Sequence, residues 1–586
     1  MVESFRAGQS WMEVEADLYN WQELEHAHRF GATSGGELLF HLLRFKGPQA
    51  LDLVEGPYAL AFFDGEAPHL ARDTVGLYRI FYRECSHNSS TKLFSFEPSR
   101  EPGWHELHPR QILTASNSQP GVSFTPRNFP EPVEGDLLEV LKSAIHSRLP
   151  GKQQVTLFLS GGVDSALLAA IMKDMKVNFK AITVGLVGCS DFVRANRVAE
   201  RMDIPLKLFE VNPDTALATV PEICERVGSS DPVKIEVGLV THFACLFCDT
   251  PVAFSGLGPD ELMGGYARMH RSPHLEALWA LRNLWHKTAP TGFPVIRPQG
   301  KILRWPYLDS KVVAVARGLS DLELTGKWAV RQLLADLGYP DLAEEGKKAA
   351  QYGSGFSKIL PSPKSEYLKN YWPANRRLLA LVSGGKDSWS AIMAMTRLNY
   401  PVAGMVCMAP ARDNSWMFQT PQVDLIREQA EASGIPLLVR PTSGEKEKEL
   451  IDLEAAIHQA AVQFKAEGVV SGAISSEYQR SRIEDICERL GLSCHAPLWG
   501  TDSEAHLRAS ARDMDFVIVS VAADGLDART WVGRPITPET AEELIALSRK
   551  FKFNPAGEGG EFETFVRNCP LFSKSIDYKP SKHIPS

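Results

Sequence analysis

The six-residue phrase Ser-Gly-Gly-x-Asp-Ser occurs twice in this chain, as SGGVDS at 160–165 and as SGGKDS at 383–388. Each copy follows a short apolar run typical of a buried strand and precedes apolar residues at helical spacing. A turn between a strand and a helix presents backbone N–H groups where the helix dipole favours an oligophosphate. The chain has no G-x-x-x-x-G-K-[ST] phrase, which excludes the common NTPase loop. The repeat therefore predicts two phosphate-binding turns of another kind.

Composition limits the other function classes. The 586 residues suffice for about three or four domains, and 44% hydrophobic with 23% charged residues is typical of a globular protein. A net charge of −8 gives no polybasic footprint, so we expect neither direct nucleic-acid binding nor membrane binding. The start lacks signal-peptide features, and nine scattered cysteines indicate reduced thiols. We expect a cytoplasmic protein.

Two loop-like stretches rich in Pro and Ser, 116–135 and 360–377, predict linkers and divide the chain into blocks 1–120, 130–358 and 376–580. The middle and last blocks alternate strand-like and helical runs, which predicts an α/β class with two tandem parallel-sheet domains. Each block carries a second Ser-Gly turn, at 255–261 and 471–477. Because ligands bind at the carboxyl ends of parallel strands, each pair of turns is expected to line one crevice.

SGGxDS resembles the PP-loop of the ATP pyrophosphatases, the adenine-nucleotide α-hydrolase-like proteins that release pyrophosphate and leave AMP on a substrate oxygen. The resemblance implies that ATP is bound at both turns. The residues concerned are Ser160, Gly161, Gly162, Asp164 and Ser165 in the middle block and Ser383, Gly384, Gly385, Asp387 and Ser388 in the last.

SGLGPDELMGGY (255–266), RWPYLD (304–309) and KKAAQYGSG (347–355) make the middle block similar to the synthetase domain of asparagine synthetases. The resemblance implies that Asp260 and Glu261 lie near a Mg²⁺-pyrophosphate, a role suited to carboxylates. Two residues before RWPYLD, where the asparagine synthetases have a glutamate, this chain has Ile302. An isoleucine can neither accept a proton nor stabilise a cationic amine. This departure favours an altered or scaffolding role over asparagine synthesis.

VEADLYN (14–20), EGPYALAFFD (55–64) and ARDTVGLYRIFY (71–82) resemble the latter half of the α+β glutaminase domain of the same family. That glutaminase uses an N-terminal cysteine, whereas this chain begins Met1-Val2. Glu15, Ala16 and Asp17 replace the family's glutamine-holding residues. Without a thiolate there is no acyl-enzyme route to ammonia, so the first block is expected to be a truncated structural remnant.

The last block carries DNSWMFQT (413–420), SGAISSEYQRSRIEDICERLGL (471–492), APLWG (496–500) and GEGGEFETFVRNCPLF (557–572). In this order the phrases resemble the diphthine–ammonia ligases. That family uses ATP to adenylate the carboxylate of a modified histidine on translation elongation factor 2, and ammonia then displaces AMP to give diphthamide. The resemblance implies an ATP-dependent, AMP-forming amide ligase. Because the first block lacks the glutaminase nucleophile, free ammonium is the expected nitrogen source.

The resemblance also suggests roles for individual residues. Asp387 and Lys386 are expected to serve catalysis at the leaving pyrophosphate, where preorganised donors stabilise developing charge. Arg480, a catalytic candidate, and Arg482 suit a phosphate or a carboxylate, because a guanidinium binds either bidentately. The alternative is a helix with solvated arginines that make i,i+4 pairs to Glu484.

The substrate is expected at Glu477, Tyr478, Arg482, Trp499, Glu558 and Glu563, with Glu561 as a further catalytic candidate. The glycine-rich acidic phrase GEGGEFET suits Mg²⁺ or the trimethylammonium of diphthine, with Trp499 and Phe562 as aromatic faces. An acidic surface turn is the alternative. By resemblance Met417 and Phe418 line the adenine pocket, or else belong to an ordinary core.

Two further hypotheses stay open. In one, the middle block forms an amide on a free amino acid; in the other, the first two blocks dock the large protein substrate. The Cys245-x-x-Cys248 pair lies in an apolar run at helical spacing and is interpreted as buried thiols, not as a metal site.

Overall fold

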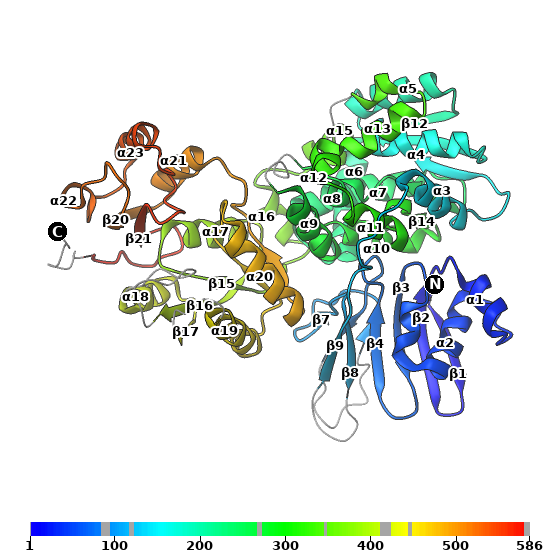
Figure 1. The fold of residues 1–586 in the computed structure, drawn as a ribbon, viewed down its shortest axis with the longest axis horizontal. Coiled ribbons are helices and arrows are strands. Elements are labelled where there is room, and N and C mark those ends of the chain that lie inside the picture. The colour runs from blue at the N-terminus through cyan, green and yellow to red at the C-terminus, as the bar shows by residue number, and fades with distance from the viewer. Residues whose placement is uncertain are drawn as a thin grey trace. The chain divides into compact units, whose positions relative to one another are not determined.

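The structure, a computed structural model, describes residues 2–83, 94–115, 122–266, 272–344, 349–410, 423–442 and 448–578. The chain forms two compact units, Met1–Pro373 and Ala374–Ser586. Along the colour bar of Figure 1 the first unit runs from blue to green and the second from yellow-green to red. Each unit contains a five-stranded parallel sheet, so the predicted α/β class is confirmed.

The first unit begins with an antiparallel sheet of six strands in the order β1-β2-β3-β4-β8-β9. Alternating burial along β2 places Met12 and Val14 in a core with helix α2, while Glu13 between them is less buried. The strands are β1 Glu3–Ala7, β2 Ser10–Ala16, β3 Tyr58–Phe63, β4 Pro68–Arg72, β8 Gln111–Ala115 and β9 Val122–Pro126, the helices α1 Trp21–His28 and α2 Gly35–Lys46, and a small second sheet holds β5 Phe81–Tyr82, β6 Phe94–Ser95 and β7 His105–Glu106.

The two parallel sheets share one topology. Their orders, β12-β11-β10-β13-β14 and β17-β16-β15-β18-β19, both place the first strand in the middle with the second and fourth beside it. The strands are β10 Val155–Phe158, β11 Phe179–Gly185, β12 Leu206–Glu210, β13 Val252–Ser255 and β14 Ile302–Arg304 in the first unit, and β15 Leu378–Leu381, β16 Val402–Pro410, β17 Leu437–Thr442, β18 Gly468–Val470 and β19 Ser493–His495 in the second. The expectation of two copies of one fold is confirmed at the level of strand order.

Helices cover the parallel sheets, and local signals set several of their ends. Helix α6, for example, begins after Asn212, which accepts the N–H of Asp214, and ends at Gly228 with φ +67°. The main helices of the first unit are α3 Leu137–Ser147, α4 Val163–Asp174, α5 Ser190–Met202, α6 Pro213–Val227, α7 Pro232–Leu246, α8 Pro259–Leu262, α9 Pro273–Lys287, α11 Ser310–Arg317 and α13 Trp328–Asp336. Those of the second are α17 Lys386–Arg397, α18 Val423–Ser433, α19 Lys448–Phe464, α20 Glu477–Leu490, α21 Ser503–Asp513, α22 Ala528–Trp531 and α23 Pro538–Phe551.

One predicted strand has another partner than expected. The run 515–523 is read from sequence as a strand of the parallel sheet, but β20 (Asp515–Val521) pairs antiparallel with β21 (Phe562–Asn568) in a separate two-stranded sheet. An apolar run predicts a strand without specifying its partner. Strand β21 begins at Phe562, within the acidic phrase GEGGEFET that the sequence suggests as a loop, and continues beyond it to Asn568.

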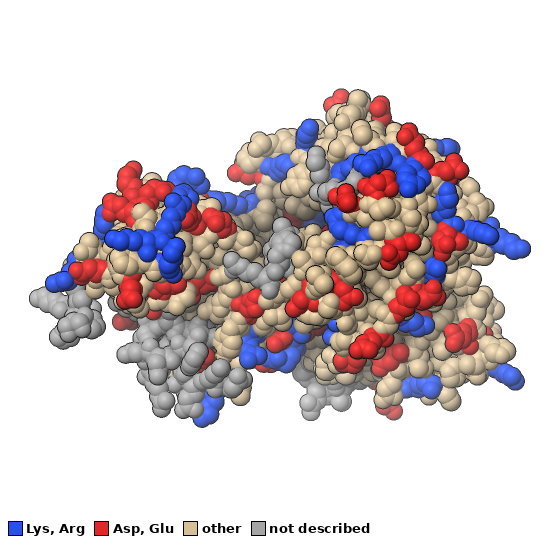
Figure 2. Space-filling model, turned by 45° about the horizontal axis from the view of Figure 1, so that its top comes forward, with Lys and Arg blue, Asp and Glu red and all other residues tan. Residues whose placement is uncertain are grey.

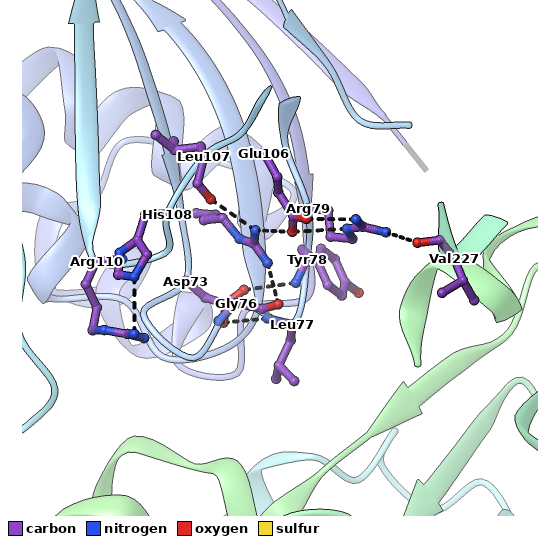
Figure 3. Close-up of polar contacts among 11 residues, drawn as sticks. Asp73, Gly76, Leu77, Tyr78, Arg79, Glu106, Leu107, His108, Arg110 and Val227 are labelled. Atoms are coloured by element: carbon purple, nitrogen blue, oxygen red, sulfur yellow. Dashed lines mark hydrogen bonds and ion pairs between the residues drawn. The ribbon is translucent and has the colours of Figure 1, made fainter. Parts of the chain in front are cut away.

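Buried arginines join the antiparallel part of the first unit to its parallel-sheet part (Figure 3). Arg72 and Arg79 both donate to the Glu106 carboxylate, at 2.6 Å from Arg72 Nη1 and 2.7 Å from Arg79 Nη2. Arg79 Nη1 also donates to the carbonyl of Val227 at the end of α6, at 2.7 Å. Asp73 caps the neighbouring turn by accepting the N–H groups of residues 76–78. The antiparallel-sheet part of the first unit is thus packed as one body with its parallel-sheet part.

On the face drawn in Figure 2, Lys and Arg side chains lie among Asp and Glu side chains. Helices α21 and α23 of the second unit show this interleaving, because Arg508 bridges to Glu542 at 2.6 Å and Arg549 to Glu504 at 2.6 Å. None of the helices in the described part of the chain combines the length and apolar character that crossing a bilayer requires.

Candidate active site

The two Ser-Gly turns of each unit lie side by side at the carboxyl end of its parallel sheet. In the second unit β15 and β18 are paired neighbours, and SGGKDS follows the first and SGAISSE the second. A Cβ on Gly472 would lie 2.7 Å from the backbone carbon of Asp387, which shows how closely the turns approach. In the first unit the equivalent distance, from a Cβ on Gly256 to the nitrogen of Ser165, is 3.1 Å. The two turns of each unit are thus neighbours, as expected, and in the second unit a pocket lies between them.

The phosphate loop of the second unit is held from several sides. Gly384 adopts φ +86°, a conformation that favours glycine, and its carbonyl accepts the N–H of Val566 at 3.1 Å and Nε2 of the buried Gln429 at 3.0 Å. At the first residue of α17, the N–H of Lys386 donates to Thr564 Oγ1 at 3.1 Å. Strand β21 therefore supports the loop directly.

Asp387 is the most constrained ionisable residue of this loop. Its carboxylate accepts from Lys386 Nζ at 3.0 Å and from His506 Nε2 at 2.7 Å. Burial alone would raise its pKa, but the charge of Lys386 and the hydrogen bond from His506 outweigh burial, and the pKa of Asp387 lies below its ordinary value. The loop thus carries an ionised aspartate at neutral pH. Lys386 is itself 2% exposed and also donates to the carbonyl of Ala556.

A pocket opens between the two turns. Its polar lining residues are Ser383, Asp387, Ser388, Ser471, Gln479 and Glu558, and its apolar lining residues include Val406, Met408, Leu453 and Ile483. A lining with both polar and apolar groups suits a ligand with a charged and a flat apolar part. Met417 and Phe418, predicted for the adenine pocket, lie outside the described residues.

The predicted arginines are in aromatic contact. Arg480, 5% exposed, lies with its guanidinium 4.5 Å from the Trp499 ring centre and its Nε 3.6 Å from Glu484. The i,i+4 pair with Glu484 that belongs to the alternative is present, but Arg480 is buried, so the solvated arginine of that alternative is wrong for this residue. Arg482 lies 5.2 Å from the ring centre of Tyr478. Glu477, half-buried, is the first residue of α20 beside them.

The acidic phrase supplies three glutamates with different surroundings. Glu558 accepts backbone N–H groups from the end of the second turn, next to α20. Glu561 accepts the N–H of Asn554 at 3.1 Å. Glu563 lies on β21, and burial raises its pKa. Phe562, one of the proposed aromatic faces, already has Lys386 Nζ 5.7 Å from its ring centre. The roles suggested for these residues toward a substrate stay predictions.

In the first unit a lysine lies against the equivalent aspartate. Lys327 Nζ, 3% exposed, donates to both oxygens of Asp164 at 2.6 Å and pairs with Asp260 at 2.7 Å. Glu261 instead accepts from Tyr266 at 2.9 Å and from Thr288, and burial raises its pKa against these hydrogen bonds.

Asp260 and Glu261 thus have different partners, and within the described ranges no group of three or more His, Cys, Asp or Glu is arranged for a metal. An ammonium between two carboxylates does not suit a resident divalent cation, and we derive no step through one. Cys245 and Cys248 are both buried, and Cys248 Sγ contacts Thr250 Oγ1 at 3.3 Å, as expected for core thiols.

Sequence reasoning missed His506, Lys327, Gln429 and Thr564 as partners of the loops. His506 and Lys327 lie 119 and 163 residues from the aspartates they contact, so spacing gives no signal. Thr564 belongs to the GEGGEFET phrase. Its hydroxyl, which can accept a hydrogen bond, is the one signal in the sequence that could have indicated a contact with the phosphate loop.

Comparison with known proteins agrees with this arrangement. The family described as "Diphthamide synthase N-terminal domain" matches residues 376–494, and "Diphthamide synthase C-terminal domain" matches 502–584. "Asparagine synthase" matches 136–293 and "Glutamine amidotransferase domain" matches 4–100. The phosphate loop SGGKDS lies in the segment 376–494, and Thr564, His506 and Glu558 lie in the segment 502–584.

Individual relatives likewise fall into two groups, diphthine–ammonia ligases and an asparagine synthetase. The diphthine–ammonia ligase of Bos taurus is 34% identical over 219 residues, which are 34% of this chain and 82% of that protein. The diphthine–ammonia ligase of Schizosaccharomyces pombe is 35% identical over 217 residues, 34% of this chain and 36% of that protein. A Methanocaldococcus jannaschii protein described as a glutamine-hydrolysing asparagine synthetase is 26% identical over 442 residues, 61% of this chain and 80% of that protein.

The pocket of the second unit lies within the residues that match the diphthamide synthase segments. Because the bovine ligase is matched over 82% of its length at 34% identity, the chain belongs to the diphthine–ammonia ligase family.

Proposed function

We propose that the second unit joins ammonia to the carboxylate of diphthine on translation elongation factor 2, with ATP converted to AMP and pyrophosphate. A carboxylate oxygen attacks the α-phosphorus and pyrophosphate leaves, which gives an acyl-adenylate. Ammonia then attacks the acyl carbon, loses a proton, and AMP departs with the carboxylate oxygen. Free ammonium is the proposed nitrogen source, and the cytoplasm the proposed compartment.

The observation that carries this proposal is the pocket between SGGKDS and SGAISSE, with the ionised Asp387 among its polar lining residues. The triphosphate would lie at the loop, where the glycines allow close backbone approach, and adenine against the apolar lining residues Val406, Met408 and Leu453. Magnesium would enter as part of the nucleotide, because Mg²⁺ is commonly held by one or two carboxylates and the phosphates themselves.

We keep the division into 1–120, 130–358 and 376–580 as the proposed domains, although the first two pack as one unit. In this proposal they have no catalytic share in the ligase reaction. The family matches support that view, because both diphthamide synthase segments, 376–494 and 502–584, lie in the second unit.

The test uses the purified full chain with elongation factor 2 that carries diphthine, ammonium and ATP. We expect AMP to form only when all three are present, and Asp387→Ala to abolish it. Asp164→Ala is the matched control and should leave the rate within twofold. AMP formation that survives Asp387→Ala would contradict the proposal.

A second candidate is amide formation on a free amino acid in the middle domain. It is favoured by the intact loop geometry there, with Gly161 at φ +74° and the second turn in van der Waals range. AMP release that depends on aspartate and disappears in Asp164→Ala would support it.

A further inference from the structure

The acidic loop before β21 contacts the second Ser-Gly turn through one side chain. Glu558 Oε1 accepts the N–H of Ile474 at 2.7 Å, of Ser475 at 2.9 Å and of Ser476 at 3.1 Å. Glu558 Oε2 accepts the N–H of Ser475 at 2.7 Å and its hydroxyl at 2.5 Å. Both carboxylate oxygens are therefore used by three consecutive backbone groups and one side chain.

These donors belong to a place that would otherwise attract an anion. Ser476 is the N-cap of α20, a helix of 14 residues, so these N–H groups lie at the N-terminal end of a helix, and Glu558, which accepts them, lines the pocket beside the phosphate loop. With Glu558 present, a protein carboxylate occupies that anion position. The neighbouring SGGKDS loop is left as the phosphate site.

The Glu558 backbone is held on the same element that supports the phosphate loop. The carbonyl of Ala556 accepts from Lys386 Nζ, and the N–H groups of Ala522 and Ala523 fix the carbonyl of Glu561 at 2.8 and 3.0 Å. Strand β21, which follows, supplies Thr564 to the N–H of Lys386. The segment around β20 and β21 thus holds both turns that line the pocket, one through Thr564 and the other through Glu558.

We propose that Glu558 is a positioning residue that fixes residues 474–476, which join the pocket-lining residues 471–473 to helix α20, and not a ligand of the substrate's trimethylammonium group. Its catalytic consequence rests on the proposed ligase function; its structural consequence does not. Removing the carboxylate frees the turn and exposes a competing anion position, so the nucleotide loses its single alignment. A displacement of about 1 Å at such a site can cost about 100-fold in rate.

The experiment compares the full-length wild type with Glu558→Ala, Glu558→Gln and a matched control, Glu454→Gln. Glu454 also contacts α20, but from outside the pocket, through Arg489 at 2.6 Å. Amide hydrogen exchange is measured at residues 474–476, and ATP affinity is measured by calorimetry without elongation factor 2. Rates of AMP formation with the diphthine-bearing factor are measured separately.

We expect exchange at the three amides to be at least tenfold faster in Glu558→Ala, intermediate in Glu558→Gln and unchanged in Glu454→Gln. ATP affinity should fall at least tenfold in Glu558→Ala. If that variant does not fold, Glu558→Gln decides by the same readouts. Unchanged exchange in both Glu558 variants would overturn the proposal, as would unchanged ATP affinity with a raised KM for the factor. If the wild-type protein forms no AMP while the Glu558 variants still show these changes in exchange and ATP affinity, the ligase function is refuted and the positioning role is supported.

Discussion

The contact between His506 and Asp387 permits a quantitative test of how the phosphate loop is held. The hydrogen bond spans 2.7 Å from a histidine on α21 to the aspartate on α17. A hydrogen bond to a charged group contributes about 1.5–3 kcal/mol. Because the Asp387 side chain is 27% exposed, water can replace part of the loss. We therefore expect His506→Leu to lower the free energy of unfolding of the second unit by about 1–2 kcal/mol.

A double-mutant cycle isolates this contact. His506→Leu, Asp387→Ala and the double variant are unfolded in urea at pH 7 and followed by tryptophan fluorescence, since Trp389 of this unit is fully buried. The coupling free energy should be about 1–2 kcal/mol. His458→Leu, on the exposed face of α19, is the control and should leave the midpoint unchanged. A coupling below about 0.5 kcal/mol would refute the reasoning, because independent sites add within that range.

The pH dependence of the same cycle follows from the lowered pKa of Asp387. A carboxyl group whose folded pKa is depressed stabilises the fold above its unfolded pKa of about 3.9, and the contribution is lost as the pH falls through the folded value. The coupling should therefore persist at neutral pH and disappear in acid. A coupling that is constant down to acid pH would indicate a contact that does not depend on the charge.

Three further predictions concern the first unit and its relation to the second. An alanine in the left-handed conformation costs about 1–2 kcal/mol. Gly161→Ala should destabilise its unit by more than this, because its Cβ would lie 2.4 Å from a backbone atom, whereas Gly384→Ala should stay near that range, because its Cβ would lie 3.2 Å from a side chain. Equal shifts of the urea midpoint in the two variants would contradict this prediction. Burial raises the pKa of Glu261, so the stability of the wild type falls as the pH rises and this carboxyl group ionises. Glu261→Gln should therefore be more stable than the wild type at pH 7 and lose this advantage below about pH 4. A difference in urea unfolding between the two proteins that does not change with pH would contradict this. Arg304→Ala should cost about 3 kcal/mol in thermal or urea unfolding, because it removes the partner of the Asp17 carboxylate, now bonded at 2.7 and 2.9 Å with its side chain 14% exposed. A loss below about 1 kcal/mol would show that water replaces the arginine.

The sequence predicts the parallel-sheet architecture well because two local signals agree. Apolar runs followed by glycine-rich turns specify where strands end, and the repeated spacing of Ser160, Ser255, Ser383 and Ser471 predicts which turns meet. Neighbouring strands in both sheets then bring the two turns together, as the pairing of β15 with β18 shows.

The remaining features depend on contacts between segments far apart in sequence. Nothing in SEAHLRAS indicates that His506 reaches Asp387, and nothing around Lys327 indicates that its ammonium lies between two carboxylates. The acidic phrase suggests a substrate site from its charges alone. The structure adds that one of its glutamates binds three successive backbone N–H groups, a role that depends on the fold of the neighbouring turn.

The central claim, that a substrate carboxylate is joined to the α-phosphorus of ATP in the second unit, is tested most directly by oxygen tracing. Elongation factor 2 with ¹⁸O in the diphthine carboxylate is incubated with the protein, ATP and ammonium, and the products are analysed by mass spectrometry. The account predicts one ¹⁸O atom in AMP and none in pyrophosphate. Label in inorganic phosphate together with ADP would place the cleavage between the β- and γ-phosphates and contradict it.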